Sequence, residues 1–190
     1  ERHIRYCKTE GKTVFGVLMM SHMADKEKLA NEAKKMQDFG AEAVILMDSS
    51  GNYLPKNVKE KVGFLTKNLK ISIGFHAHNN LGMGVANSIA AIESGARLID
   101  GSSRGFGAGA GNAQLEVLVS VLDKMGYKTG IDLYKMLDAS DLAETELIEH
   151  LPYISSSSIV SGLSGVFSGY LAPVKRIAKD YNIDPRDLFF

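Results

Sequence analysis

The sequence predicts an α/β fold in which four strand–helix units form a parallel sheet. Apolar runs typical of strands covered on both faces alternate with segments whose apolar residues recur at helical spacing. Such alternation gives parallel strands joined by right-handed crossovers. Four units are half of a (β/α)8 barrel, and the same order also fits an open four-stranded sheet of the flavodoxin type.

The expected elements can be placed in chain order. A helical opening segment precedes the first strand. The helix that follows this strand is expected over 25–39, and Gly40 is a suitable C-cap for it. Pro55 fits the first turn of the next helix, which is expected over 55–69. Asn112 is expected to cap the last helix of the sheet region. The predicted strands are 13–20, 43–48, 71–76 and 97–101, and the predicted helices are 1–9, 25–39, 55–69, 83–93 and 112–125.

Polar side chains at the carboxyl ends of all four predicted strands favour the half barrel. Enzymes of this architecture place their chemistry at that end. The chain also opens inside helical sequence, as if a strand had preceded it. The residues at the four ends are His22, then Asp48 with Ser49, then His76 with His78, then Asp100 with Ser102.

Composition narrows the functional class. Lys plus Arg and Asp plus Glu are both 22, so we expect no nucleic-acid partner. No apolar run reaches the ~20 residues of a membrane helix, so no membrane association is expected. The single Cys7 suits a reducing compartment, and a cytoplasmic location is expected.

The character of the chain changes beyond Tyr127, and strand patterns no longer occur. Residues 131–148 are predicted to be helical, 155–158 to be a short linker, and a small-residue-rich stretch over 161–170 to lead into a helix ending near Asp180. Small residues at this density predict close packing against another surface. We therefore divide the chain into a barrel part, 1–128, and a helical part, 129–190.

His76 and His78 form the sharpest motif. Residues i and i+2 of a strand point to the same face, so both imidazoles are expected to enter one small space at the strand's end. Two neutral imidazoles side by side are suited to sharing a divalent cation, although surface or structural histidines are the alternative. A carboxylate normally completes such a site, and Asp48 and Asp100 end neighbouring strands.

Other polar positions are open to two interpretations. The glycine-rich stretch 105–111 before a helix could cradle an anion or form a tight turn that needs small residues. Ser49 could bind a carboxylate or belong to a capping turn. His22 could act as a base, but a solvated loop histidine is the simpler interpretation.

Taken together, these residues resemble the 4-hydroxy-2-oxovalerate aldolases, metal-dependent pyruvate aldolases of the (β/α)8 superfamily that includes hydroxymethylglutaryl-CoA lyase. The resemblance extends over nearly the whole chain. It is carried by residues 16–23, Asp48 with Ser49, residues 76–81, 84–91, 107–113 and 115–117, and 132–134.

The resemblance implies a role for each of several residues. His76 and His78 would be two protein ligands of a divalent cation, most often Mn2+. Ser49 would hydrogen-bond the carboxylate of the 2-oxo acid, and Phe167 would stand where a tyrosine often contacts the aldehyde end. Asp48 and Asn112 would be polar neighbours of the cation. The implied reaction is reversible cleavage of a 4-hydroxy-2-oxo acid to pyruvate and an aldehyde.

The resemblance also implies what this sequence lacks. The family's first-strand motif, with its Asp ligand, its Arg and a nearby His base, does not occur here. The chain then corresponds to the last four βα units and a helical communication domain that docks an acylating acetaldehyde dehydrogenase. We expect this polypeptide alone to be nearly inactive. A Claisen-type lyase acting on acyl-CoA and a non-catalytic docking module are the alternatives.

Overall fold

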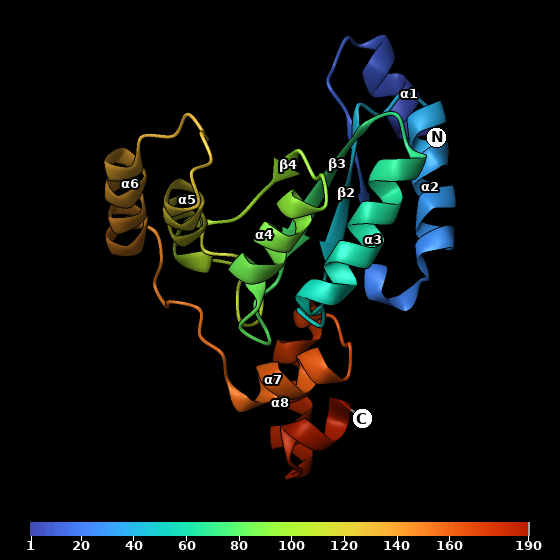
Figure 1. The fold of residues 1–190 in the computed structure, drawn as a ribbon. Coiled ribbons are helices and arrows are strands. Elements are labelled where there is room, and N and C mark those ends of the chain that lie inside the picture. Colours follow the sequence, from blue (N-terminus) through green and yellow to red (C-terminus); the bar gives the residue numbers. More distant parts are fainter. Residues whose placement is uncertain (190) are drawn as a thin grey trace.

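The computed structural model describes residues 1–189 and contains a four-stranded parallel sheet in the simple order β1-β2-β3-β4 (Figure 1). Helices α2, α3 and α4 make the crossovers between successive strands. This arrangement confirms the predicted α/β fold. The bounds are β1 Phe15–Leu18, α2 Lys26–Asp38, β2 Ala43–Asp48, α3 Pro55–Asn68, β3 Ser72–Ala77, α4 Gly84–Glu93 and β4 Leu98–Ile99.

The three crossover helices cover one face of the sheet (Figure 1). A row of paired residues, Gly16, Val44 and Ile73, belongs to this face, and Val44 and Ile73 are buried in the core. Gly16 allows α2 to approach β1 closely, because a Cβ there would lie 2.4 Å from the Met36 sulfur. The main core therefore lies between this face and the helices.

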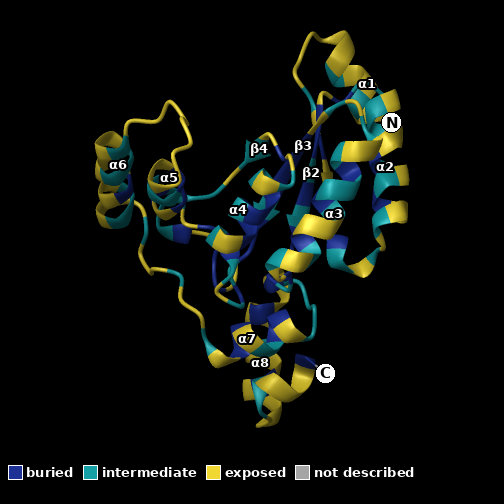
Figure 2. Cartoon of the chain, viewed as in Figure 1, coloured by how far each residue is buried: buried dark blue, intermediate teal, exposed yellow. Residues whose placement is uncertain are grey.

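The outer sides of the crossover helices are exposed, while much of the sheet beneath them is buried (Figure 2). The opposite face of the sheet is more open. The row that pairs Val17, Ile45, Gly74 and Leu98 belongs to this face. Phe15 and Val17 of β1 are 47% and 40% exposed. An apolar face that remains this open in the described part of the chain matches the inner wall of an incomplete barrel.

Several predicted boundaries differ from the observed ones. β1 ends at Leu18, because Met20 adopts a left-handed backbone conformation with φ of 50°. β4 is only two residues long. Asn112 does not cap a helix, since α5 is Leu115–Lys124 with Gln114 as its N-cap. The expected linker 155–158 is wrong, because the Ser155 hydroxyl caps α7, Ser156–Leu163.

The helices beyond α5 form two groups. Helix α6, Leu133–Glu146, packs on α5 and on a 3-10 turn at Ser103–Gly105, where the Arg104 Nε donates to Glu144 over 2.7 Å. Helix α7 packs against α8, Leu171–Tyr181, at the end of the sheet where the strands finish (Figure 1). We call residues 150–189 the C-terminal helical segment. The division at 128 and 129 stays a prediction.

The remaining elements are short. Helix α1, Arg2–Thr9, has no buried residue and is linked to the body by the ion pair between Lys8 and Glu42. Three further 3-10 turns complete the described chain: η1 Ser21–Met23, η3 Ser168–Tyr170 and η4 Pro185–Phe189.

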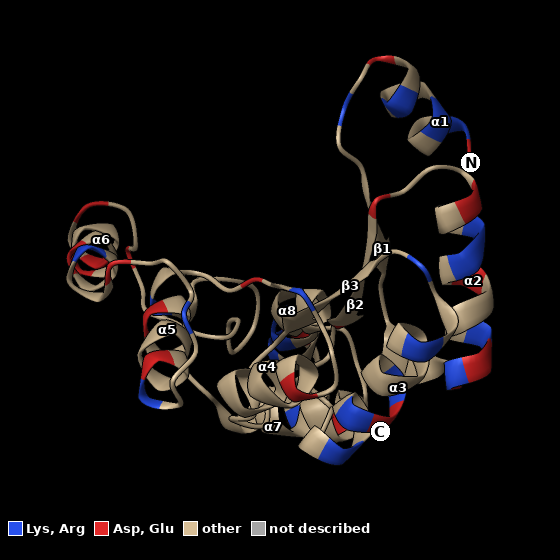
Figure 3. Ribbon diagram, turned by 45° about the horizontal axis from the view of Figure 1, so that its top comes forward, with Lys and Arg blue, Asp and Glu red and all other residues tan. Residues whose placement is uncertain are grey.

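Charged residues of both signs are interspersed over the outer helices (Figure 3). Ion pairs such as Lys26–Glu60 and Lys59–Glu93 join neighbouring helices there. Among the helices formed by residues 1–189, none combines the length and apolarity that crossing a membrane requires.

The open sheet face predicts that this chain associates with itself. Because Val17 is exposed among apolar neighbours, Val17→Lys should weaken the association by placing a charge on the contact surface. Sedimentation velocity over a concentration series measures the effect. Asn31→Lys, which adds the same charge on exposed α2, is the control and should associate like the parent chain. A parent chain that stays monomeric at every concentration would contradict the prediction.

Candidate functional site

The two histidines of the predicted motif lie together at the carboxyl end of β3. His76 is in the strand and pairs with Met47 of β2, and His78 follows directly after the strand. Their ring centroids are 5.2 Å apart and the rings are inclined by 68°. The strand geometry thus brings both imidazoles to one place, as their i, i+2 spacing predicts.

His78 is buried and only 7% exposed. Burial, with a smaller contribution from the neighbouring His76, lowers the pKa of His78 to about 4. The ring is therefore neutral at pH 7, which is the form that binds metals. Its Nδ1 has no hydrogen-bond partner within residues 1–189. A buried nitrogen of this kind is costly unless something coordinates or hydrogen-bonds it.

Asn112 stands next to His78, to which it is joined by an isolated antiparallel bridge. Its amide nitrogen donates to the Phe106 carbonyl over 3.1 Å and to the Ser102 hydroxyl over 3.3 Å. Its Oδ1 is buried and has no partner in the described chain. The amide oxygen of this bridging residue therefore remains free to accept within the described chain.

The glycine-rich loop is a tight turn that positions Asn112. The Asn112 N–H donates to the Gly105 carbonyl over 2.9 Å, and the Asn79 N–H donates to the Gly111 carbonyl over 2.9 Å. Gly111 has φ of +83°, and a Cβ there would lie 2.2 Å from the Gly105 oxygen. The tight-turn interpretation of this stretch therefore accounts for its glycines.

Asp48 is fully buried at the end of β2. Its two carboxylate oxygens accept hydrogen bonds from the backbone N–H groups of Asn52 and Tyr53, over 3.0 and 3.1 Å. Burial raises the pKa of Asp48 to about 6, against the opposing effect of these hydrogen bonds. Asp48 thus shapes the turn that follows β2.

Ser49 is linked to the segment that carries Phe167 by a backbone hydrogen bond from Ser168. Ser49 is buried, and its hydroxyl oxygen accepts from the Met20 N–H over 2.8 Å. The Ser49 carbonyl accepts from the Ser168 N–H over 3.4 Å. Phe167 is half-buried and packs edge-to-face on Tyr170, with centroids 6.0 Å apart. Both predicted substrate-binding residues therefore lie at the carboxyl edge of the sheet.

The donor set near β3 fits a divalent cation in part. Two imidazoles are suitable ligands, the Asn112 amide oxygen has no partner within residues 1–189, and neutral His78 needs no deprotonation. Within residues 1–189, however, no three His, Cys, Asp or Glu side chains are grouped closely enough to hold a metal ion. The described chain therefore supplies an incomplete ligand set.

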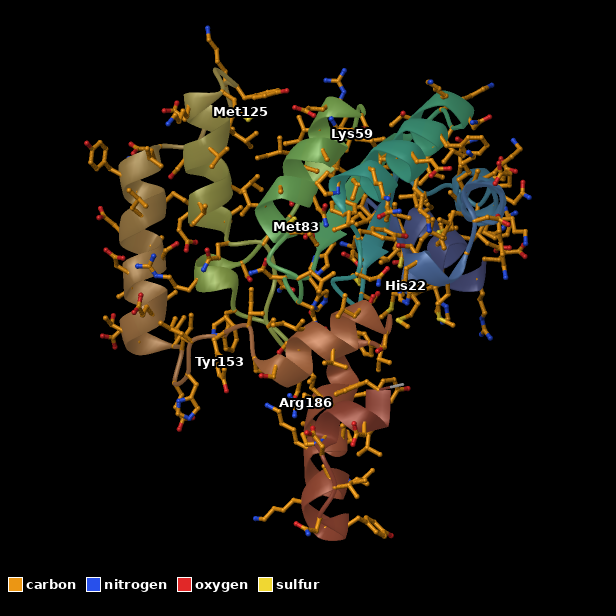
Figure 4. The ribbon with its side chains drawn as sticks, turned by 60° about the horizontal axis from the view of Figure 1, so that its bottom comes forward. His22, Lys59, Met83, Met125, Tyr153 and Arg186 are labelled. Atoms are coloured by element: carbon orange, nitrogen blue, oxygen red, sulfur yellow. The ribbon has the colours of Figure 1, made fainter. Side chains whose placement is uncertain are left out.

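The strand-end loops are joined to the C-terminal helical segment by hydrogen bonds. His22 lies where the N-terminal elements meet this segment (Figure 4), and its Nε2 is 2.7 Å from the Gly165 carbonyl. Its Nδ1 is 3.3 Å from the Ser50 hydroxyl. Burial lowers the pKa of His22, so a neutral ring that donates from Nε2 explains both contacts. The expected solvated loop histidine is therefore wrong.

Asn80 makes the corresponding link from β3. Its side chain is fully buried, donates to the Ser158 carbonyl over 3.1 Å and accepts from the Ser168 hydroxyl over 3.0 Å. Gly162 lets α7 come close, since a Cβ there would lie 2.9 Å from the Asn80 Cβ. The predicted close packing of the small-residue stretch is thus observed. Asn80 itself was missed as a site residue, although it directly follows the histidine motif.

A hydrogen-bond network that sequence analysis also missed joins α3 to the turns that follow β1 and β2. The Lys61 ammonium donates to the carbonyls of Ser21 and Ala24, each over 2.8 Å, and to the Tyr53 hydroxyl over 2.9 Å. The Tyr53 hydroxyl in turn donates to the Ser21 hydroxyl over 2.9 Å. This network fixes the turn that carries His22. Sequence gives no signal for it, because Lys61 belongs to an amphipathic helix like other lysines of the chain.

Asn80→Ala should loosen the C-terminal helical segment. The substitution removes the hydrogen bond to the Ser158 carbonyl and leaves the Ser168 hydroxyl without its acceptor in a buried place, at a cost of about 1–3 kcal/mol. Hydrogen exchange of α7 and α8 amides should accelerate more than that of β2 amides. Exposed Asn31→Ala is the control and should exchange like the parent chain. Equal protection of α7 in both variants would contradict this account.

Known protein families resemble this chain in both its sheet region and its C-terminal helical segment. Residues 1–143 match the HMGL-like family, and residues 152–190 match the DmpG-like communication domain. A 4-hydroxy-2-oxovalerate aldolase of Spirochaeta aurantia is 66% identical over the whole chain, and one of Pectobacterium atrosepticum is 57% identical. The chain covers 56% and 55% of these proteins, so it spans about half the length of these curated relatives.

A solved structure agrees on the fold. The carboxyl transferase domain of Rhizobium etli pyruvate carboxylase aligns with 97% of this chain and 33% of its own, with a TM-score of 0.79 and 18% identity. This likeness concerns the fold alone and supports a partial (β/α)8 barrel. Since the family match extends over most of the chain, from residue 1 to residue 143, the chain belongs to the HMGL-like family.

Proposed function

We propose that this chain is part of a class II, metal-dependent aldolase that cleaves a 4-hydroxy-2-oxo acid reversibly to pyruvate and an aldehyde. The observation that carries the proposal is the pair of imidazoles, whose centroids are 5.2 Å apart and of which His78 has a buried Nδ1 with no partner within residues 1–189. The names of the relatives, which are aldolases for 4-hydroxy-2-oxovalerate, support the substrate class.

His76 and His78 are the residues that would hold the divalent cation, with Mn2+ as the metal we propose. Asn112 would offer its amide oxygen, and Asp48 would support the neighbouring turn. A divalent cation, when bound, supplies positive charge that stabilises the enolate of pyruvate as the carbon–carbon bond breaks. The third protein ligand would come from outside this chain.

The proposed cleavage breaks one carbon–carbon bond and moves one proton. The C3–C4 bond breaks, its electron pair passes to C3 and the 2-oxo oxygen, and the proton of the C4 hydroxyl goes to a base. C4 leaves as the aldehyde carbon, and the enolate takes up a proton at C3 to give pyruvate. We assign neither the base nor the arginine that the resemblance implies to residues 1–190.

Ser49 and Phe167 are proposed to contact the substrate. The Ser49 oxygen accepts one hydrogen bond from Met20, so its own proton remains to be donated to a carboxylate. Phe167 would offer an apolar ring to the aldehyde end. Tyr170, whose ring packs on Phe167, carries a hydroxyl that could replace the one that phenylalanine lacks.

The C-terminal helical segment is proposed to dock an acylating acetaldehyde dehydrogenase, which would receive the aldehyde. The match of residues 152–190 to the DmpG-like communication domain supports this partner class. Exposed apolar side chains of this segment, such as Tyr153, Leu163 and Tyr181, offer contact area. The same match favours the aldolase over a Claisen-type lyase within the HMGL-like family.

Calorimetric titration with Mn2+ tests the metal site. The chain should bind one ion, and the double variant His76→Ala/His78→Ala should lose this binding because it removes both imidazoles. His150→Ala, which removes an exposed histidine from the connection between α6 and α7, is the control and should bind like the parent. Binding that survives in the double variant would assign the metal to other residues.

Complementation tests the reaction. The chain alone should form almost no pyruvate from 4-hydroxy-2-oxopentanoate, because its ligand set is incomplete. Joined in one polypeptide to the remaining part of the Spirochaeta aurantia relative, it should release pyruvate, followed through NADH consumption by lactate dehydrogenase. The same fusion carrying His78→Ala should be inactive. A fusion that binds Mn2+ yet cleaves no 4-hydroxy-2-oxo acid would refute the aldolase and leave a docking module.

A further inference from the structure

Asp100 lies directly beside the first histidine of the site. The pairing of Gly74 with Leu98 and of Phe75 with Ile99, continued by one residue, sets His76 opposite Asp100. Paired residues of parallel strands share a face. The Asp100 Oδ1 is 2.5 Å from the His76 Nδ1, and the two side chains are 50% and 16% exposed.

This distance identifies a hydrogen bond rather than two ligands of one ion. Nitrogen and oxygen ligands stand about 2.1 Å from a small divalent cation, so neighbouring ligands at right angles are about 3.0 Å apart. The observed 2.5 Å between Nδ1 and Oδ1 is too short for that arrangement and places the ring nitrogen in hydrogen-bond contact with the carboxylate. The geometry therefore does not favour Asp100 as the carboxylate that completes the ligand set.

The two histidines differ in the hydrogen-bond partner of their Nδ1 atoms. His76 has a carboxylate on its Nδ1, whereas the Nδ1 of His78 has no partner within residues 1–189. A ring that donates Nδ1–H to a carboxylate keeps its Nε2 lone pair free, and the carboxylate makes that nitrogen more basic. Asp100 makes no other side-chain hydrogen bond in the described chain, so this contact accounts for its geometry.

We propose that Asp100 is a positioning residue that holds His76 as the Nδ1–H tautomer and presents its Nε2 to the cation. The inference rests on the proposed metal function and adds to it the atom of His76 that coordinates. It also assigns different roles to the two acidic residues at the strand ends, Asp48 and Asp100. Asp48 holds its own turn through Asn52 and Tyr53, whereas Asp100 acts on a ligand.

The tautomer can be measured without any metal. Long-range proton–nitrogen spectra of the 15N-labelled, metal-free 190-residue chain should show His76 with a protonated Nδ1 and a bare Nε2. Asp100→Ala should shift the ring toward the Nε2–H form, and Asp100→Asn should lie between because its amide oxygen still accepts a weaker hydrogen bond. Asp123→Asn, on the exposed part of α5, is the control and should leave the His76 signals unchanged.

Zn2+ serves as a diamagnetic probe of the coordinating atom. On titration of the same chain, the His76 Nε2 resonance should shift while Nδ1 keeps its proton. Asp100→Ala should weaken Zn2+ binding by about 10- to 100-fold, as removal of such a partner typically does. Asp123→Asn should bind like the parent chain.

The outcomes separate this inference from the proposed function. A Zn2+-induced shift of the His76 Nδ1, or a tautomer unchanged in Asp100→Ala, would overturn the role of Asp100 while leaving the metal site intact. Failure of the parent chain to bind either Mn2+ or Zn2+ would overturn the metal site itself. An Asp100-dependent tautomer together with Nε2 coordination would support both.

Discussion

The parallel pairing of four strands in chain order is the constraint on which the rest of this molecule depends. It brings every strand to the same edge at its carboxyl end, so residues far apart in sequence meet there. Asp48 ends β2, while His76 of β3 lies opposite Asp100, which follows β4. A slip of one residue in this register would turn the imidazole of His76 toward the helices, where Val44 and Ile73 now pack.

The same edge is also where the C-terminal helical segment attaches. Its contacts are polar as well as apolar: His22, Asn52 and Asn80 each hydrogen-bond a backbone carbonyl of this segment, at Gly165, Gly162 and Ser158. Loops that would otherwise bury unpaired groups are satisfied by the segment, so strand ends and helices stabilise one another. The region matched to a communication domain is thereby connected directly to the loops that surround the histidines.

Against this background of satisfied groups, the unpaired atoms are informative. Three buried side-chain atoms have no partner in the described chain, and two of them, the Nδ1 of His78 and the Oδ1 of Asn112, belong to the strand-end site, whereas the Asn87 Oδ1 belongs to α4. A neutral imidazole nitrogen without a proton and an amide oxygen are both groups that can bind a cation. The HMGL-like match and the half-length overlap with aldolases are consistent with a ligand set that this chain shares with further residues.

The sequence by itself determined the α/β order, because apolar runs and helical periodicity are local properties, and it brought His76 and His78 to one face through strand spacing. Only the tertiary structure decided that Asn112 stands beside His78 instead of capping α5, and that Asp100 hydrogen-bonds His76. These features depend on register and loop closure between segments distant in sequence, and local propensity carries no information about such pairings.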